Sequence, residues 1–242
     1  QTPYLRPDAI AAYYEIHIEQ GPAMESEGIP VGIVSGIRGN FRCREASCAG
    51  EYGHCGTVPR ALRRDSVAAV AELVSRTDDL WATLEEEGQD LAVTFGVIST
   101  DDVHSAASKV AGDVRFTIDV RSRSAETLAA VREQLDATIA EIEERRGVRI
   151  DLGPCSETAP ADMDLGLRKR LLRSASELDI PVLEMPSGAG HDALVFAGCG
   201  VPAAMLFIRN AHGSHNPREA MEMEDFAKAS SILTASLMAA GS

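Results

Sequence analysis

The order of hydrophobic periodicities between residues 41 and 152 constrains the fold of this chain more than any other feature. Segments with a period of two, typical of strands, alternate there with segments of helical spacing. They predict, in chain order, a strand at 41–48, a helix at 65–84, strands at 91–99 and 113–121, a second helix, and a strand at 148–152. Ser124 is a suitable N-cap for that second helix, and Gly147 is a suitable end. This β-α-β-β-α-β order is typical of an antiparallel sheet with two helices on one face.

The segments on either side of this region have α/β character. On the N-terminal side they predict a strand at 13–21 and an apolar run at 29–37. On the C-terminal side they predict a helix at 165–178, a strand at 181–185, a helix from about 191, a strand at 202–208, a loop at 209–219 and a helix at 224–239. Glycines between Gly32 and Gly39 indicate a hinge. We therefore expect an α/β fold, with residues 1–36 and 154–242 in a catalytic domain and residues 37–153 in an inserted α+β lid or dimerisation domain.

Composition excludes several classes of function. The chain has 242 residues, of which 45% are hydrophobic, enough for one large or two small cores. Its formal net charge of -14 argues against nucleic-acid binding, which generally needs a basic surface. The sequence has no apolar run of membrane-spanning length and no signal-peptide pattern, so we expect a soluble, cytoplasmic protein that does not bind membranes. The five cysteines form no C-x-x-C pair, which predicts reduced thiols.

The strand at 13–21 alternates apolar and polar residues and stops at a glycine, which places His17 and Glu19 on one face near its end. His215 lies in the loop that follows the strand at 202–208. Ligand sites of open α/β sheets lie at such strand ends, and neutral imidazoles are common zinc ligands. The alternative is that these side chains occupy solvated surfaces. Spacing alone favours that alternative for His17 with Glu19 and leaves both interpretations equal for His215.

Two glycine-rich segments are further candidates. The first, residues 50–59, contains His54 between glycines; it lacks the Gly-Lys-Ser of a phosphate-binding loop, so a tight turn between strand and helix is the simpler interpretation. The second, Ser187-Gly188-Ala189-Gly190-His191-Asp192, is either a helix start capped by Ser187 or a backbone nest that holds an anion.

Four motifs together resemble those of one enzyme family. They are Glu15-Ile16-His17-Ile18-Glu19-Gln20-Gly21-Pro22, the Gly-His-x-Gly-Thr-x-Pro run at 53–59 with Arg63-Arg64-Asp65 after it, the segment 187–193, and Gly213-Ser214-His215-Asn216-Pro217-x-Glu219. In order and separation they resemble the N-carbamoyl-L-amino-acid hydrolases and allantoate amidohydrolases, a branch of the dinuclear-metal aminoacylase and carboxypeptidase superfamily. The resemblance covers nearly the whole chain.

The resemblance implies a role for several residues. His17 and His215 would each bind one of two divalent metal ions, which would be zinc, manganese, cobalt or nickel. Gln20 would contact a small carboxylate-bearing substrate, and Arg121 would hold its carboxylate, which a planar guanidinium can bind bidentately. Further pocket-lining residues would be Gly188, Ala189 and His191. His54 would stabilise the developing oxyanion in the neighbouring subunit, which requires a homodimer formed through the lid.

The chain also departs from the family pattern. Ser108 stands where the family has an asparagine that helps to bind substrate, and Arg60 replaces a methionine. The family's remaining metal ligands and its glutamate base precede the equivalent of His17, so we expect a missing N-terminal segment or second chain. The resemblance implies a metal-dependent amidohydrolase that cleaves a C–N bond of an N-carbamoyl amino acid or ureido acid. The alternatives are an aminoacylase or dipeptidase, and a non-catalytic chain that lacks the metal centre.

Overall fold

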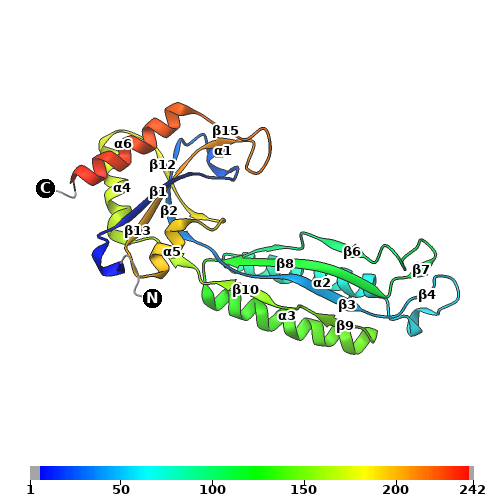
Figure 1. Cartoon of the computed structure of the whole chain (residues 1–242). Coiled ribbons are helices and arrows are strands. Elements are labelled where there is room, and N and C mark those ends of the chain that lie inside the picture. The colour runs from blue at the N-terminus through cyan, green and yellow to red at the C-terminus, as the bar shows by residue number, and fades with distance from the viewer. Residues whose placement is uncertain (1–5, 240–242) are drawn as a thin grey trace. The chain divides into compact units, whose positions relative to one another are not determined.

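The computed structural model describes residues 6–239 and divides into two compact units (Figure 1). Unit 1 consists of Gln1–Arg38 and Pro160–Ser242, and unit 2 consists of Gly39–Ala159. The fold is of the mixed α/β class that the sequence predicts. No helix within residues 6–239 is long and apolar enough to cross a membrane.

Unit 1 is built on a five-stranded mixed sheet. β1 (Tyr13–Ile18) runs parallel to β13 (Ala203–Ile208), which is antiparallel to β2 (Val31–Ile37). β2 also pairs with β12 (Val182–Ser187) in parallel and with the short β11 (Ala161–Asp162) in antiparallel orientation. Ile18 lies opposite Ile208, so β1 and β13 end at the same edge of the sheet. The residues that follow these two strands therefore emerge side by side.

Helices cover both faces of this sheet. α4 (Leu165–Glu177) and α6 (Met223–Ala239) pack on one face against Val31, Ile33 and Leu206. α1 (Ala23–Glu27) and α5 (Asp192–Gly198) contribute Met24, Ala193 and Leu194 to the core on the other face. All seven residues of β2 are therefore buried. This strand therefore covers most of the range predicted as a hinge. Gly32 has a packing role within it, because a Cβ there would lie 3.1 Å from both Met24 Sδ and Phe207 Cβ.

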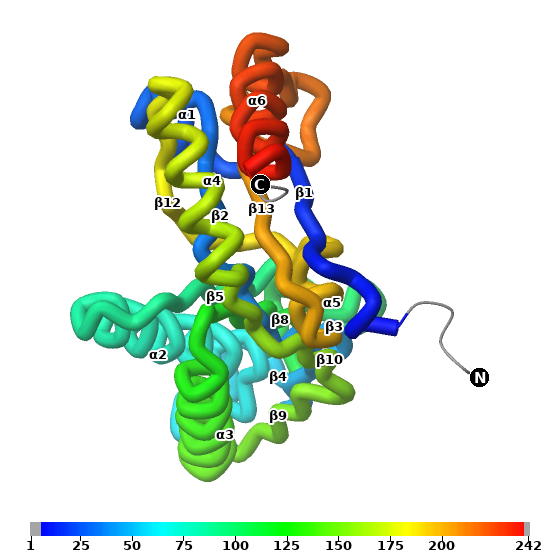
Figure 2. Tube along the Cα trace, turned by 90° about the vertical axis from the view of Figure 1, so that its left-hand side faces the viewer, coloured from blue at the N-terminus to red at the C-terminus, as the bar shows by residue number. Residues whose placement is uncertain are grey.

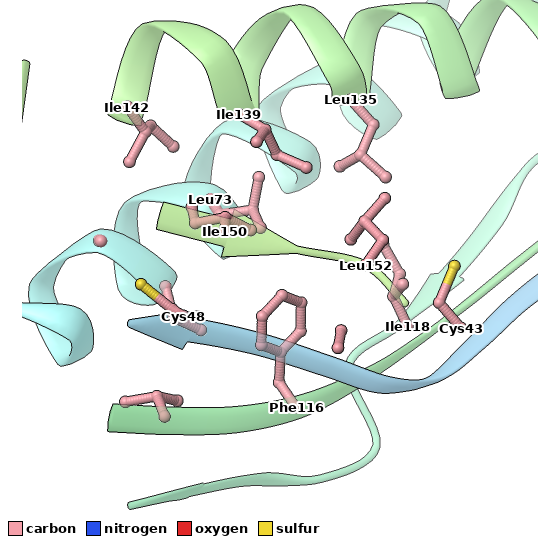
Figure 3. Close-up of a cluster of buried hydrophobic side chains, with 14 of the residues drawn as sticks. Cys43, Cys48, Leu73, Phe116, Ile118, Leu135, Ile139, Ile142, Ile150 and Leu152 are labelled. Carbon is pink, nitrogen blue, oxygen red and sulfur yellow. The ribbon is translucent and has the colours of Figure 1, made fainter. Parts of the chain in front are cut away.

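Unit 2 is an antiparallel sheet with two helices, as predicted. Its sheet contains β3 (Gly39–Ala49), β5 (Ala92–Thr94), β6 (Ile98–Thr100), β8 (Asp113–Ser122), β9 (Arg149–Asp151) and β10 (Cys155–Thr158). α2 (Ser66–Glu86) and α3 (Ala125–Arg146) lie side by side (Figure 2). Their apolar stripes meet β3, β8 and β9 in one core, in which Phe116, Leu73 and Leu135 are fully buried (Figure 3).

The single strand predicted at 91–99 is wrong. The structure has two short strands, β5 and β6, which both pair with β8. Between them the amide of Val97 donates to the side-chain hydroxyl of Thr117 at 3.1 Å, while the carbonyl of Val97 accepts from the amide of Thr117. A side-chain acceptor thus replaces a backbone carbonyl in the ladder, and the strand is interrupted there.

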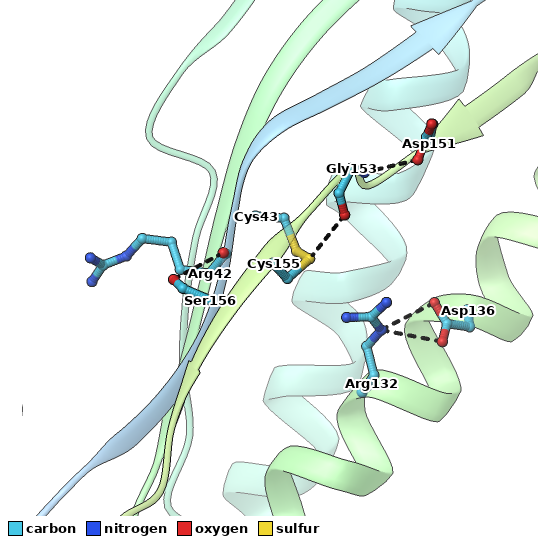
Figure 4. Close-up of a disulfide and its surroundings, with 8 residues drawn as sticks. All are labelled: Arg42, Cys43, Arg132, Asp136, Asp151, Gly153, Cys155 and Ser156. Atoms are coloured by element: carbon cyan, nitrogen blue, oxygen red, sulfur yellow. Dashed lines mark hydrogen bonds and ion pairs between the residues drawn. A yellow bond between two sulfur atoms is a disulfide. The ribbon is translucent and has the colours of Figure 1, made fainter. Parts of the chain in front are cut away.

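The expectation that all five cysteines are reduced is also wrong. Cys43 and Cys155 form a disulfide, while Cys48, Cys55 and Cys199 are free (Figure 4). Cys43 on β3 lies directly opposite Cys155 on β10. The sequence did not indicate this pairing, because residues 155–158 have no apolar alternation and were not predicted to form a strand.

Short elements complete the chain. They are the 3-10 turns η1 (Pro7–Ala9) and η2 (Arg60–Leu62), the pair β4 (Gly53–His54) with β7 (Lys109–Val110), and the pair β14 (Asn210–Ala211) with β15 (Ala220–Met221). The β14–β15 pair closes the loop that carries His215. The β4–β7 pair brings the His54 loop beside Ser108.

Candidate active site

A cleft of about 700 Å³ opens in unit 1 where β1 and β13 end. Its polar lining comes from His17 on β1, from Gln20 just after β1, and from the loop between β14 and β15. That loop contributes Ser214, His215, Asn216 and Glu219. The structure therefore brings His17 and His215 together in one cleft, although 198 positions separate them in the sequence.

The ring of His17 is oriented by its own strand. Its Nδ1 lies 2.8 Å from the carbonyl oxygen of Ile18. A carbonyl oxygen can only accept, so Nδ1 carries the hydrogen and a neutral ring keeps its lone pair on Nε2. Metal-binding histidines are commonly fixed by such a bond from the other ring nitrogen. His17 thus has the tautomer that a metal ligand needs.

His215 is held by an unusual backbone. Its φ of +61° and that of His212, +65°, lie in the left-handed region. The amide of His215 donates to Glu219 Oε2 at 3.0 Å, and the side chain of Asn216 donates to the carbonyl of His212 at 2.8 Å. Hydrogen bonds from Ser214 and from the amide of His215 hold the pKa of the Glu219 carboxyl below its usual range. Hydrogen bonds within the loop therefore fix the backbone around His215.

Gln20 connects the end of β1 to this loop. Its amide donates to Asn210 Oδ1 at 2.9 Å, and its side-chain Nε2 lies 3.3 Å from Ser214 Oγ. The buried Asn210 in turn donates to the carbonyl of Gly213 at 2.7 Å. Sequence reasoning missed Asn210, although a polar residue two positions after the apolar run 203–208 was a usable signal.

Glu19 does not face the cleft. Its carboxylate is buried and accepts from the amides of Ala23 and Met24, both at 2.8 Å. These are the first residues of α1, whose amide groups have no partner within the helix. The expectation that Glu19 shares a face with His17 thus gives way to a helix-capping role.

His191 lies behind His17 with a side chain that is only 2% exposed. The two rings pack edge to face with centroids 4.7 Å apart. Ser187 Oγ donates to the carbonyl of Ala189 and therefore accepts from His191 Nε2 at 2.8 Å. Burial, reinforced by the nearby His17, lowers the pKa of His191 to about 4, so its ring is neutral at pH 7.

The carboxylate of Glu15 on β1 contacts both the start of α5 and the ring of His191. One carboxylate oxygen accepts from the amide of Ala193 in the first turn of α5 at 2.8 Å, and the other lies 3.8 Å from His191 Nδ1. The cleft is lined by neither His191 nor the predicted pocket residues Gly188 and Ala189. His191 reaches it only through its packing against His17.

The remaining predicted site residues belong to unit 2. Arg121 makes a bidentate ion pair with Asp119, with Nε and Nη2 at 2.9 and 3.0 Å from the two carboxylate oxygens. Arg42 binds the same carboxylate. Burial alone would raise the pKa of Asp119, but the two guanidinium groups outweigh it and the pKa is lowered. One fork edge of Arg121 is therefore already occupied by a carboxylate.

His54 and Ser108 lie close together in unit 2. The amide of Cys55 donates to the carbonyl of Ser108 at 3.0 Å across the β4–β7 pair. The ring of His54 is exposed, and its Nδ1 accepts from the amide of Gly56 at 3.1 Å. A neutral His54 ring therefore carries its hydrogen on Nε2, which makes Nε2 a hydrogen-bond donor.

Metal ligation by these residues is incomplete. Within residues 6–239 no three His, Cys, Asp or Glu side chains are grouped so that they could hold a metal ion. Catalytic zinc sites generally use three protein ligands. His17 and His215 are suitable donors, but the described residues do not by themselves build a metal centre.

The two-unit α/β fold with two histidines in one cleft can be compared with known proteins. Residues 3–239 match Peptidase family M20/M25/M40, and the chain belongs to this family. It is 33% identical to the N-carbamoyl-L-amino acid amidohydrolase of Geobacillus stearothermophilus over 94% of this chain and 54% of the relative. It is also 33% identical to the allantoate amidohydrolase of Escherichia coli, over 90% of this chain and 52% of the relative.

A solved structure agrees with the fold. An amidase of the hydantoinase/carbamoylase family from Burkholderia multivorans superposes with a TM-score of 0.83 at 25% identity, covering 94% of this chain and 54% of that one. The chain thus spans about half the length of the relatives that it matches. These relatives are amidohydrolases, and the chain shares their fold.

Proposed function

We propose that this chain forms the C-terminal part of an amidohydrolase that cleaves a C–N bond of an N-carbamoyl amino acid or an allantoate-like ureido acid. The observation that carries the proposal is the cleft at the ends of β1 and β13, where His17 and His215 lie with Gln20 between their two segments. The names of the relatives support the substrate class, because N-carbamoyl amino acids and allantoate both combine a ureido group with a carboxylate.

Two divalent metal ions, zinc or else manganese, cobalt or nickel, are part of this proposal. His17 would bind one ion and His215 the other, with the remaining donors supplied from outside the described residues. The fixed tautomer of His17 supports its role. Such ions would make a water molecule nucleophilic at neutral pH.

The other residues would bind and orient the substrate. The side chain of Gln20 lines the cleft and can donate to the ureido oxygen. Arg121 would hold the substrate carboxylate, which a planar guanidinium can bind bidentately. His54 would donate from Nε2 to the oxygen that becomes negative when the carbonyl is attacked.

A homodimer through unit 2 completes the proposal, because His54 would act in the neighbouring subunit. The edge of the unit 2 sheet supports it: β6 pairs only with β8 among the described strands, and Ile98 is 51% exposed. An uncovered apolar edge is a natural surface for pairing with a second copy. Sedimentation should show a dimer at micromolar concentration, and a monomer would contradict this part of the proposal.

The proposed activity is tested with protein expressed from the complete reading frame and loaded with zinc or manganese. Turnover should be measured on an N-carbamoyl-L-amino acid, allantoate, an N-acetyl amino acid and a dipeptide. We expect the first two to be cleaved, and His215→Ala to reduce kcat by at least about a thousandfold. His104→Ala is the matched control, because His104 is an exposed histidine of unit 2 paired with Asp101. Absence of ureido cleavage, or an equal loss in the control, would refute the proposal.

Arg121 is tested through the substrate carboxylate. Arg121→Lys should raise KM about tenfold or more for N-carbamoyl amino acids, since a point charge replaces a fork. The same change should leave KM unaltered for a neutral ureido amide, which lacks the carboxylate. Equal effects on both substrates would show that Arg121 acts only through its ion pair with Asp119.

A further inference from the structure

Unit 2 contains an open pocket with a volume of about 610 Å³ that is lined mainly by arginines. It forms where η2 and the residues before α2 meet the C-terminal end of α3. The guanidinium-bearing residues are Arg60, Arg63, Arg64, Arg145 and Arg146. We call this surface the arginine pocket.

Several of these side chains are held in place by the fold. Arg63 Nε donates to the carbonyl of Val58 at 2.9 Å, and its Nη2 donates to the carbonyl of Cys55. Arg64 lies against Gly147, where an added Cβ would be 3.3 Å from Arg64 Nε. Gly147 has a φ of +64°, so a residue without a side chain is favoured there for two reasons. The arginine pocket is therefore shaped before any ligand enters.

The charges in the arginine pocket are unbalanced. Glu72, whose side chain is 15% exposed, binds Arg145 and Arg146, and Glu51 lies 3.8 Å from Arg64. Five guanidinium groups thus face two carboxylates, which leaves an excess of three positive charges. This excess is notable in a chain with a net charge of -14.

Fold stability explains only part of this cluster. Arg145 and Arg146 end α3 and complement the negative end of its dipole, besides joining α3 to α2 through Glu72. Arg63 donates to neutral carbonyls, so its charge is not neutralised by these bonds. Arg60 is exposed and Arg64 has only the long contact with Glu51. Within residues 6–239, none of these three guanidinium groups has a short ion pair that neutralises its charge.

We propose that the arginine pocket binds a small phosphate-bearing anion. An excess of three positive charges matches the two or three negative charges of a phosphate or diphosphate near pH 7. The planar forks of arginine bind phosphate oxygens in pairs, and several forks on one concave surface can share a single tetrahedral group. All the lining residues belong to unit 2, so the arginine pocket is distinct from the unit 1 cleft.

Calorimetric titration of the 242-residue chain with inorganic pyrophosphate tests this inference. We expect one molecule to bind per chain, with an affinity that falls as sodium chloride is raised. Inorganic phosphate should bind more weakly at the same place. Citrate, a tricarboxylate of similar charge, should bind at least about tenfold more weakly than pyrophosphate if phosphate geometry matters. No binding at millimolar pyrophosphate, or equal binding of citrate, would overturn the proposal.

Variants locate the binding. Arg60→Ser and Arg64→Ser should each weaken pyrophosphate binding about tenfold, because each removes a charge-assisted contact. Neither residue makes a short ion pair with another residue of the described range 6–239, so folding should be retained. Arg132→Ser is the charge-matched control, since Arg132 pairs with Asp136 on α3 and is not part of the arginine pocket. A change below twofold in the control supports the assignment, and an equal loss in the control refutes it.

Discussion

The two units differ in where their backbones adopt the left-handed conformation. Among residues 6–239, the non-glycine residues with positive φ are Gln20, Asp179, His212 and His215, all in unit 1. In unit 2 the described residues with positive φ are Gly88, Gly147 and Gly153. A side chain in this conformation costs about 1–2 kcal/mol relative to the right-handed form. Three of the four unit 1 residues flank the cleft, so unit 1 accepts backbone strain where side chains must be placed, and unit 2 uses glycine.

Two helices of unit 1 start differently from those of unit 2. In unit 2, Asp65 caps α2 and Ser124 caps α3, each from the residue just before the helix. In unit 1, Asp164 caps α4 in the same local way, but Glu19, the residue after β1, caps α1, and Glu15 on β1 caps α5 across 178 positions. β1 and the residue after it therefore fix both the ring of His17 and these two helices. The comparison indicates that the helix starts of unit 2 are set by neighbouring residues, whereas the unit 1 site also depends on a cap from a distant strand.

The largest expected effect concerns the disulfide of unit 2. Replacing Cys43 and Cys155 by serine should lower the free energy of unfolding of unit 2 by about 2–4 kcal/mol, because the bridge restricts the unfolded chain. Guanidinium titration followed by fluorescence of Trp81, the single tryptophan, reports on unit 2. Hydrogen exchange in β13 should be unchanged, and Cys199→Ser is the control for an exposed free cysteine. Equal destabilisation of both units would show that they do not unfold separately.

Acid should distinguish the units with a smaller effect. The pKa of His191 is about 4 in the folded chain against 6.5 in the unfolded chain, so the unfolded state takes up the proton first as the pH falls. The free energy of unfolding of unit 1 is therefore unaffected by the protonation of His191 above pH 6.5 and falls by about 1–3 kcal/mol as the pH decreases from 6.5 toward 4.

Unit 2 should respond only in stronger acid. The bond from His104 lowers the pKa of Asp101 to about 2 from 3.8, so the related loss begins below about pH 4. Hydrogen exchange of the metal-free chain from pH 7 to pH 3 should show unit 1 opening first. His191→Gln should flatten the unit 1 profile between pH 6.5 and pH 4. If both units opened at the same pH in the wild type, and His191→Gln did not change the unit 1 profile, the role given to His191 would be contradicted.

The smallest expected effect tests backbone strain directly. Gln20→Gly should stabilise unit 1 by about 0.5–1 kcal/mol, because relief of the left-handed strain exceeds the added entropy of the unfolded glycine. The proposed hydrolysis should nevertheless decrease, since the Gln20 amide is lost. Asp179→Gly is the matched control: it relieves similar strain away from the cleft and should leave turnover unchanged. Gly147→Ala in unit 2 should be destabilising by about 1 kcal/mol. A destabilised Gln20→Gly protein would contradict the strain argument.

The parts of the fold that were predicted from the sequence are those that depend on neighbouring residues. Ser124 and Gly147 bound α3 as expected, and the alternation at 113–121 gave β8. Long-range contacts were not predictable: neither the polar edge strand β10 nor the cap of α5 by Glu15 leaves a local pattern.

The candidate site shows the same division. The positions of His17 and His215 at strand ends followed from the strands themselves, and the structure places both in one cleft. The Asp119–Arg121 pair was visible in the sequence as two charges on one strand face, yet was not anticipated. The proximity of His54 to Ser108 depends on the two-residue strands β4 and β7, which are too short to show a period.

The central claim is that His17 and His215 face one cleft as metal ligands, each part of an incomplete set. It is tested most directly by following ¹⁵N-histidine resonances while zinc is titrated into the 242-residue chain. Of the six histidines, we expect His17 and His215 to shift first, in fast exchange, because two imidazoles without further donors bind zinc weakly. Shifts confined to His54 or His104, or tight binding of two zinc ions by this chain alone, would contradict the account.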